Sequence, residues 1–326
     1  MNNLTLTSKR FVAPGLITLV LLILLATLPR YAPAYTVILL TSVSMYAILT
    51  VSWVIFSGPT GYVSLAPAAF FGVGIYTSAI LGKALPLLVV IAMGGLASFC
   101  LALLIGALTL RLRGIYFTIF TFGLVELIKN LLLWYEVNIT GVRGRFVIVV
   151  DNKTIYYGML IIFVMALLTA YLIRRSKFGL ALQSIGESEE AAAHIGINVT
   201  RLKVITFAIS AVFMGAAGAV IATRWTYVDP YIAFDYNYSF MTVLMAIFGG
   251  LGQFYGPILG AAILGYLEEI LITRFPYYYM LLFGLILVGV ILFLPNGLAG
   301  LIQRGGAALR QLRWRQGEGA RKHANT

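Results

Sequence analysis

Side chains able to do chemistry are few in this chain, and their spacing forms no catalytic set that we can defend. His194, His323 and the single cysteine, Cys100, lie far apart and predict neither a metal site nor a disulfide framework. Gly82-Lys83 is followed by Ala84, which does not match the phosphate-binding loop of nucleotide hydrolases. The sequence therefore predicts no enzyme activity, no metal and no cofactor bound by this chain.

The long polar stretch from Ser176 to Gly218 predicts a short docking helix. Ser188 stands at an N-cap position, the acidic residues after it suit the helix dipole, and Gly196 ends the helix where a left-handed residue is favoured. Gly186 is expected to break the preceding apolar stripe. A helix of about two turns is unstable alone, so it must pack against its own protein or a partner. An ordinary loop with a helical kink is the alternative. The expected contact residues are Ser188, Glu189, Glu190, Ala191, Ala192, His194 and Gly196.

One acidic and one basic residue lie inside an apolar segment, where charge is costly and often functional. Glu126 and Lys129 are three residues apart, so they share one helix face and can neutralise each other. We expect either a structural ion pair or, for Glu126, a role in gating or substrate passage.

The composition predicts an integral membrane protein. Hydrophobic residues make up 61% of the chain and charged residues 10%, and apolar runs of membrane-spanning length recur throughout. The net charge of +12 does not indicate nucleic-acid binding, because no basic groove is interleaved with exposed aromatic residues. Loop Lys and Arg in such a protein usually mark the cytoplasmic side.

Ten segments are expected to cross the membrane. The first could be a signal peptide, since Ala32-Pro33-Ala34 follows it, but its apolar run is longer than usual and we take it as a span. We expect a transmembrane domain over 1–302, with a cytoplasmic loop at 174–203, and a basic cytoplasmic tail over 303–326. The ten segments are 11–29, 35–56, 64–82, 86–109, 115–135, 154–173, 204–222, 239–251, 257–273 and 278–295.

The count of ten depends on the glycine-rich stretch from Gly249 to Pro257. If it is a turn between two spans, 15 Lys and Arg residues lie inside and seven outside, with Lys129 in the membrane. If 239–272 crosses once, the split is 10 inside and 12 outside. The positive-inside rule favours the first arrangement, with both termini cytoplasmic.

Two apolar segments interrupted by glycine and proline, 58–76 and 249–260, lie in opposite halves of the chain. Such pairs often mark the pathway of transporters built from repeated halves. Close helix packing through small residues is the alternative, as in Gly215-x-x-Gly218, and both can hold. The residues expected along the path or at its hinges are Gly58, Gly61, Ser64, Pro67, Gly72, Gly74, Glu126, Gly249, Gly250, Gly252, Gly256 and Pro257.

Several of these stretches resemble the signatures of the branched-chain amino acid permeases of ABC importers, over about residues 35–300. Glu190-Ala191-Ala192-x-x-x-Gly196 is similar to the loop that seats in a cleft of the ATPase subunit. The chain looks closest to the M-type of the two paired permeases. The other matches, in family order, are Gly58-x-x-Gly61-x-x-Ser64-Leu65 with Phe70-x-Gly72-x-Gly74-x-Tyr76; Leu110 to Phe117 and on to Glu126; Ser176-x-Phe178-Gly179 through Asn198 to Gly218; Gly249-Gly250-x-Gly252-x-x-x-Gly256-Pro257; and Pro295-x-Gly297-Leu298.

The resemblance implies an all-α polytopic fold of about ten helices, built from pseudo-repeated halves, in the inner membrane of a prokaryote. It implies ATP-driven import of branched-chain amino acids, coupled through the 188–196 helix. The implied partners are a second, homologous permease, two cytoplasmic ATPases that hydrolyse the ATP, and an extracytoplasmic substrate-binding protein.

This chain departs from the family pattern in its first signature. Tyr62 stands where the family usually has Gln, and Ala66-Pro67 where it has Gly. Urea, short amides and aromatic acids, which related permeases carry, therefore stay open as substrates. A channel and a secondary transporter are the other classes, although the spans offer few ionisable groups besides Glu126.

Overall fold

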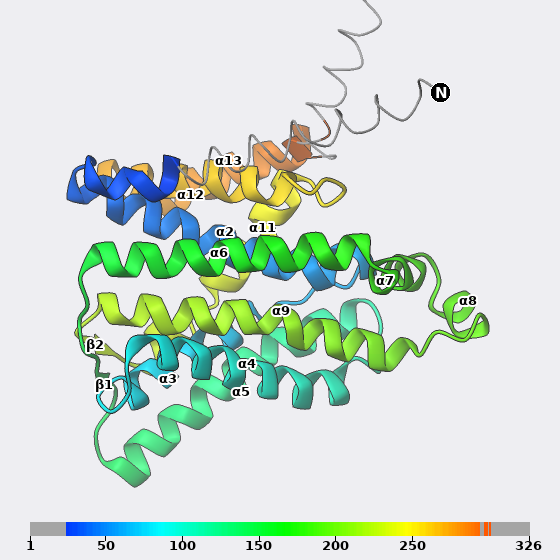
Figure 1. The fold of residues 1–326 in the computed structure, drawn as a ribbon, viewed down its shortest axis with the longest axis horizontal. Helices are drawn as coiled ribbons and strands as arrows, with labels where there is room; N and C mark the ends of the chain where they lie inside the picture. The colour runs from blue at the N-terminus through cyan, green and yellow to red at the C-terminus, as the bar shows by residue number, and fades with distance from the viewer. Residues whose placement is uncertain (1–23, 294–296, 299, 301–326) are drawn as a thin grey trace, which may run out of the picture.

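A computed structural model describes residues 24–293, 297–298 and 300, and it is almost entirely helical (Figure 1). Of the expected first span, 11–29, only residues 24–29 are among the described residues. The basic tail, 303–326, lies wholly outside them. The helices are α2 (Ala34–Thr60), α3 (Pro67–Leu81), α4 (Leu87–Thr109), α5 (Ile115–Tyr135), α6 (Asn152–Arg175), α7 (Lys177–Glu187), α8 (Glu189–His194), α9 (Val199–Ile221), α10 (Pro230–Ala233), α11 (Asn237–Gly249), α12 (Gly256–Arg274) and α13 (Tyr279–Phe293), with short turns at Leu28–Arg30, Glu136–Thr140 and Ala222–Arg224.

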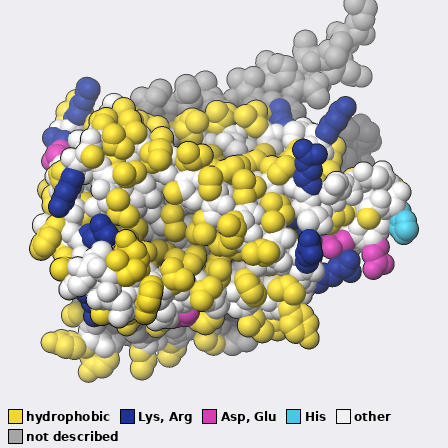
Figure 2. All heavy atoms as spheres, turned by 90° about the horizontal axis from the view of Figure 1, so that it is seen from below, with side chains coloured by type: hydrophobic (Ala, Val, Ile, Leu, Met, Phe, Trp, Pro, Cys, Tyr) yellow, Lys and Arg dark blue, Asp and Glu magenta, His cyan; other side chains and the backbone are white. Residues whose placement is uncertain are grey.

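Most of the long helices run along one axis, with α5 inclined to it, so the molecule has two ends (Figure 1). At one end β1 (Arg145–Phe146) pairs antiparallel with β2 (Tyr227–Val228), and we call this the ribbon end. The other end carries α7 and α8, and we call it the α8 end. Figure 2 shows hydrophobic side chains over the middle of one face and Lys and Arg near the two ends. This distribution suits a protein whose long axis crosses a bilayer.

Six helices among the described residues are long and apolar enough to cross a membrane. They are α2, α4, α6, α12, α5 with its extension to Thr140, and α9 with its extension to Arg224. The expected segments beyond the first each contain a helix, and α5 has the expected bounds. However, α3 and α11 have only 15 and 13 residues. The architecture is therefore that of a polytopic helical membrane protein, while the count of ten crossings stays a prediction.

The helix break after α2 is where the sequence places it, although α2 extends beyond residue 56. The helix continues through Gly58-Pro59 to Thr60, because a proline in the last turn removes only one backbone hydrogen bond. Gly61 then takes a left-handed φ of 71°, residues 61–66 are not helical, and α3 begins at Pro67.

Side chains from three other helices satisfy the backbone of the 61–66 segment. Thr118 donates to Val63 O at 2.8 Å, and Thr121 accepts from Leu65 N at 3.0 Å, both from α5. Trp53 Nε1 of α2 donates to Ser64 O at 2.8 Å. Ser239 of α11 accepts from Ala68 N and donates to Leu65 O, each at 2.9 Å. Irregular backbone is tolerated inside a membrane protein only with such partners.

Small residues bring α3, α4 and α9 into close contact. A Cβ placed on Gly74 of α3 would lie 1.9 Å from Gly215 O of α9. One placed on Gly215 would lie 2.5 Å from Gly94 O of α4 and 2.1 Å from Ser98 Oγ. These distances leave no room for a side chain, so the three backbones pack directly, as membrane helices with small residues do.

We predict that Gly215→Val destabilises the protein by about 1–3 kcal/mol, because the added methyl groups force α3 and α4 away from α9. The thermal midpoint of the detergent-solubilised protein measures the effect. Gly284→Ala on α13, where a Cβ meets nothing within 4 Å, is the control and should not lower the midpoint. Equal midpoints for Gly215→Val and the unsubstituted protein would contradict this account of the packing.

Candidate functional site

Local signals position α8 as the sequence predicts. The side chain of Ser188 accepts a hydrogen bond from Ala191 N at 3.3 Å and caps the helix. At the other end Gly196 has a φ of 87°, Gly196 N donates to Ala193 O, and Ile197 N donates to Ala192 O. This pair of bonds is the Schellman arrangement, which satisfies the last carbonyls of a helix. The six-residue helix is thus capped at both ends, and its own Ala192 is buried against the rest of the protein.

The apolar stripe of α7 stops before Gly186 as expected, but the helix itself does not end at this glycine. α7 continues through Gly186 to Glu187. A Cβ at this position would lie 2.2 Å from the carbonyl oxygen of Pro59. The glycine is needed because α7 crosses the end of α2 at this point, not because the helix stops there.

A charged cluster ties α8 to the core of the protein. Glu189 Oε1 accepts hydrogen bonds from Lys203 Nζ at 2.7 Å and from Tyr62 OH at 2.6 Å. Arg113 Nε lies 3.3 Å from Glu189 Oε2. The cluster therefore joins α8, the start of α9, the loop before α5 and the broken segment 61–66. The sequence marks Arg113 only as part of a cytoplasmic turn and of a family signature, and Tyr62 only as a departure from the family pattern. It gives Lys203 no role beyond its positive charge.

The burial of Lys203 makes the cluster depend on its partners. Lys203 is only 2% exposed, and its Nζ lies 3.2 Å from Tyr62 OH and 4.5 Å from the centre of the Tyr62 ring. A buried ammonium must be paired and hydrogen-bonded. Burial raises the pKa of the Glu189 carboxyl, but the bonds from Lys203 and Tyr62 and the positive charges outweigh burial and hold the pKa below its usual value. The carboxylate's contribution to stability is therefore complete at neutral pH and is lost only as pH falls through that lowered pKa.

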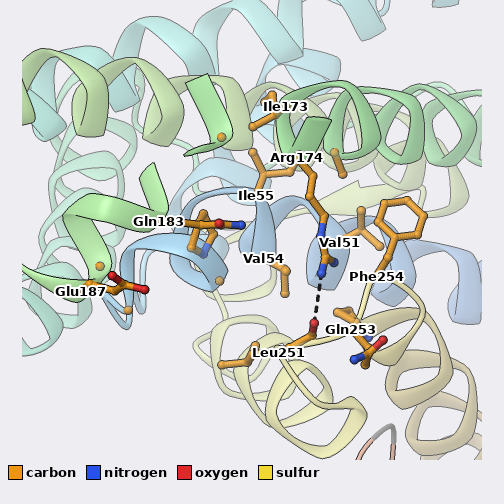
Figure 3. Close-up of a pocket in the computed structure, with 18 residues that line it drawn as sticks. Val51, Val54, Ile55, Ile173, Arg174, Gln183, Glu187, Leu251, Gln253 and Phe254 are labelled. Atoms are coloured by element: carbon orange, nitrogen blue, oxygen red, sulfur yellow. Dashed lines mark hydrogen bonds between the residues drawn. The ribbon is translucent and has the colours of Figure 1, made fainter. Parts of the chain in front are cut away.

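A cavity of about 420 Å³ lies beside this cluster, between α2, α6, α7 and the loop from α11 to α12 (Figure 3). Val51, Val54 and Ile55 of α2 form its apolar wall. Arg174 of α6 points across it, and its Nη2 donates to Gly252 O at 3.1 Å. Four of the expected pathway residues line it, from both interrupted segments: Gly58, Gly61, Gly252 and Pro257. The two breaks, distant in sequence, thus meet at one cavity.

A second hollow, of about 530 Å³, lies on the other side of the break, beneath α8. Tyr62, Arg113, Glu189 and Glu190 line it, and Gly61 and Gly186 line both hollows. The contact between α7 and the end of α2 therefore separates the two spaces.

Apart from Glu126, the other expected pathway residues lie in packed regions. Ser64 and Pro67 are buried near Trp53. Gly72 faces Phe234, and Gly74 contacts α9. Gly249 and Gly256 face each other across the turn from α11 to α12, and Gly250 has a φ of 97°. This arrangement corresponds to the close packing that the sequence leaves as an alternative.

Glu126 and Lys129 form the ion pair that their spacing predicts. The sequence does not single out Glu136, whose side chain is buried. Its carboxylate accepts from Tyr76 OH at 3.2 Å and from Gly144 N at 2.8 Å, and Arg145 Nε lies 3.7 Å away. This cluster fastens α3 to the ribbon end. Within the described part of the chain, no group of three or more His, Cys, Asp or Glu residues is placed to hold a metal ion.

We predict that Lys203→Met loosens α8, because Glu189 loses the charged donor that anchors it. Hydrogen bonds to charged groups contribute about 1.5–3 kcal/mol, so the opening of residues 188–197 should become easier by that amount. Backbone hydrogen exchange of the solubilised protein measures this. Lys177→Met, at an exposed position on α7, is the matched control. Unchanged exchange in both variants would show that the cluster does not hold α8.

Comparison with known proteins places the chain among membrane permeases. A family model described as "Branched-chain amino acid transport system / permease component" matches residues 35–291. The chain is 28% identical over 318 residues to the high-affinity branched-chain amino acid transport system permease protein LivM of Salmonella typhimurium, covering 87% of this chain and 74% of the relative. It is 28% identical to LivM of Escherichia coli, covering 85% and 73%. The high-affinity branched-chain amino acid transport system permease protein LivH of Salmonella typhimurium is 29% identical over 143 residues, covering 43% of this chain and 46% of the relative. No solved structure matches the chain.

Proposed function

The chain belongs to the branched-chain amino acid transport permease family, and we propose that it is the membrane subunit of an ATP-driven importer of branched-chain amino acids. The observation that carries the proposal is α8. It is capped at both ends, tied to the membrane helices through Glu189, and turns other side chains outward. The side chain of Glu190 is 79% exposed and Ile195 is 73% exposed. A short helix that is capped at both ends and is followed by an exposed isoleucine is suited to fill a cleft in a partner protein.

The α8 end is then the cytoplasmic end. Arg111 and Arg113 lie there between α4 and α5, Arg174 and Arg175 lie in the last turn of α6, and Lys177 is the first residue of α7. With Lys9, Arg10 and the basic tail on the same side, this end has 15 Lys and Arg residues against seven at the other, an excess that is typical of the cytoplasmic side. The proposed arrangement has ten crossings over residues 1–302, a basic tail over 303–326 and both termini in the cytoplasm.

The proposed partners follow from the family. The relatives include two different permease proteins of branched-chain amino acid systems, LivM and LivH, which supports pairing with a second, homologous permease. We propose that two cytoplasmic ATPases bind the α8 ends and hydrolyse the ATP, and that an extracytoplasmic binding protein delivers the amino acid at the ribbon end.

The contacts of Glu189 suggest how movement reaches the membrane. When ATP draws the two ATPases together, each carries the α8 helix that it holds. Glu189 then pulls on Lys203 at the start of α9 and on Tyr62 in the broken segment 61–66. Because residues 58–61 and 252–257 line the same cavity, displacement of the break changes the shape of that cavity. ATP shifts the equilibrium only because the ATPases contact the two states of the permease differently.

We predict that Gly196→Asp separates the permease from its ATPases. A residue other than glycine in the left-handed region costs about 1–2 kcal/mol, and the new carboxylate lies on the surface that faces the ATPase. Purification through a tag on the permease should recover fewer ATPases, and ATP-dependent uptake should fall about tenfold or more.

Gly141→Asp is the matched control for this experiment. Gly141 also has a left-handed φ, of 68°, with nothing near a Cβ, but it lies at the ribbon end. This variant should keep its ATPases, because the ribbon end does not face them. Full uptake by Gly196→Asp at normal membrane abundance would refute the assignment of α8 as the docking helix.

A further inference from the structure

One face of α5 exposes polar groups at a depth where lipid would not accept them. Glu126 is 11 residues beyond Ile115, which places it about 16 Å along the helix and near its middle. Its side chain is 38% exposed. Asn130, one turn further, is exposed as well, and its Nδ2 donates to Glu126 O at 2.8 Å. A carboxylate and an amide therefore reach the surface of the protein together.

Contact of these groups with lipid is unfavourable. A charged side chain at the centre of a membrane helix costs at least about 2.5–3.5 kcal/mol, and such groups almost always face protein or water. Lys129 neutralises the charge from beneath, with its side chain 11% exposed, but Glu126 and Asn130 still face outward. Among the described residues of this chain, none covers the exposed part of these two side chains. Water or other protein, from a second subunit or from the undescribed part of this chain, must therefore lie against this face.

The surroundings of Glu126 combine few polar groups with aromatic walls. Phe122, one turn before Glu126, has its ring centre 5.9 Å from that of Phe240 on α11. The ring centre of Phe240 lies 6.0 Å from that of Tyr236, and these two residues are 39% and 47% exposed. Lys129 Nζ lies 5.5 Å from the centre of the Tyr231 ring. We call this set the polar–aromatic face: Phe122, Glu126, Lys129, Asn130, Tyr231, Tyr236 and Phe240.

The polar–aromatic face is continuous with the ribbon end. Arg143 Cζ lies 4.6 Å from the centre of the same Tyr231 ring, and Arg143 pairs with Asp229 at 2.8 Å. Charged and aromatic groups thus extend from the ribbon end to the middle of α5. A solute released at that end meets polar partners along this line instead of bare hydrocarbon.

We propose that the polar–aromatic face is this subunit's wall of the substrate path, and that it recognises a zwitterionic amino acid with an aliphatic side chain. The Glu126 carboxylate accepts a hydrogen bond from the ammonium group of the substrate, and the aromatic rings contact the aliphatic side chain of the substrate. The near neutrality of the Glu126–Lys129 pair matches the net neutrality of such a substrate. Small-molecule sites usually consist of apolar and aromatic walls with a few polar groups at defined positions. The second permease supplies the opposite wall. This inference rests on the proposed import function and adds the residues of this chain that would line the path and contact the amino acid.

The test uses the assembled transporter with both permeases, its ATPases and its binding protein, in lipid vesicles. Cys100 is first changed to alanine, which removes the only cysteine of this chain. Asn130→Cys and Leu131→Cys are then compared for reaction with a charged, membrane-impermeant methanethiosulfonate. Leu131 is the matched control, because it is the next residue along α5 and is 63% exposed.

A path predicts that Asn130→Cys reacts at least about tenfold faster than Leu131→Cys, since the reactive thiolate forms in water and not in hydrocarbon. Leucine with its binding protein should slow the reaction of Asn130→Cys. Glu126→Gln, added to that variant, should abolish the slowing. ATP-dependent leucine uptake by the unsubstituted complex is measured in the same vesicles.

Each contrary result overturns a stated part of the proposal. If uptake is normal but both cysteines are equally reactive or equally unreactive, the face does not line a path. If Asn130→Cys reacts quickly but leucine has no effect, or if the effect survives Glu126→Gln, the face does not recognise the amino acid. If the unsubstituted complex shows no ATP-dependent uptake, the proposed import function itself is wrong.

Discussion

The structure depends on satisfying the backbone of residues 61–66, where the chain is not helical between two apolar helices. In an apolar surrounding each unpaired amide or carbonyl costs free energy, so the segment must find partners within the protein. Trp53, Thr118, Thr121 and Ser239 supply them from α2, α5 and α11. These helices must therefore stay in register around the break, which fixes the arrangement of the centre of the molecule.

The same segment carries the residue that connects the membrane helices to α8. Tyr62 donates to Glu189, which also accepts from the buried Lys203, so a movement of α8 reaches both the break and the start of α9. Opposite this cluster, Gly186 lets α7 lie directly on the carbonyl of Pro59. The break is thus held on one side by the charged cluster and on the other by a helix crossing. We regard it as the point at which movement of α8 is converted into a change in the cavity between the two interrupted segments.

Features set by local sequence could be predicted, and features set by distant contacts could not. Ser188 and Gly196 cap α8 as expected, because capping depends on neighbours within a few residues. The breaks at Gly61 and Gly250 follow from glycine and proline in the same way. Gly186, by contrast, marks only the end of an apolar stripe in sequence and is required by Pro59, far away in the chain. The meeting of Tyr62, Arg113 and Lys203 at Glu189, the burial of Glu136 and the pairing of β1 with β2 also depend on tertiary packing, which spacing alone does not reveal.

The central claim is that α8 and the broken segment move as one unit. The most direct test is the distance between spin labels in the assembled transporter lacking Cys100, with one label at Ala193 of α8 and one at Val63 of the break, both at accessible positions. Adding a non-hydrolysable ATP analogue should leave the Ala193–Val63 distance unchanged and should change the distance from each of them to Val142 at the ribbon end. A change in the Ala193–Val63 distance, with the break fixed relative to Val142, would show that α8 moves alone and would contradict the account.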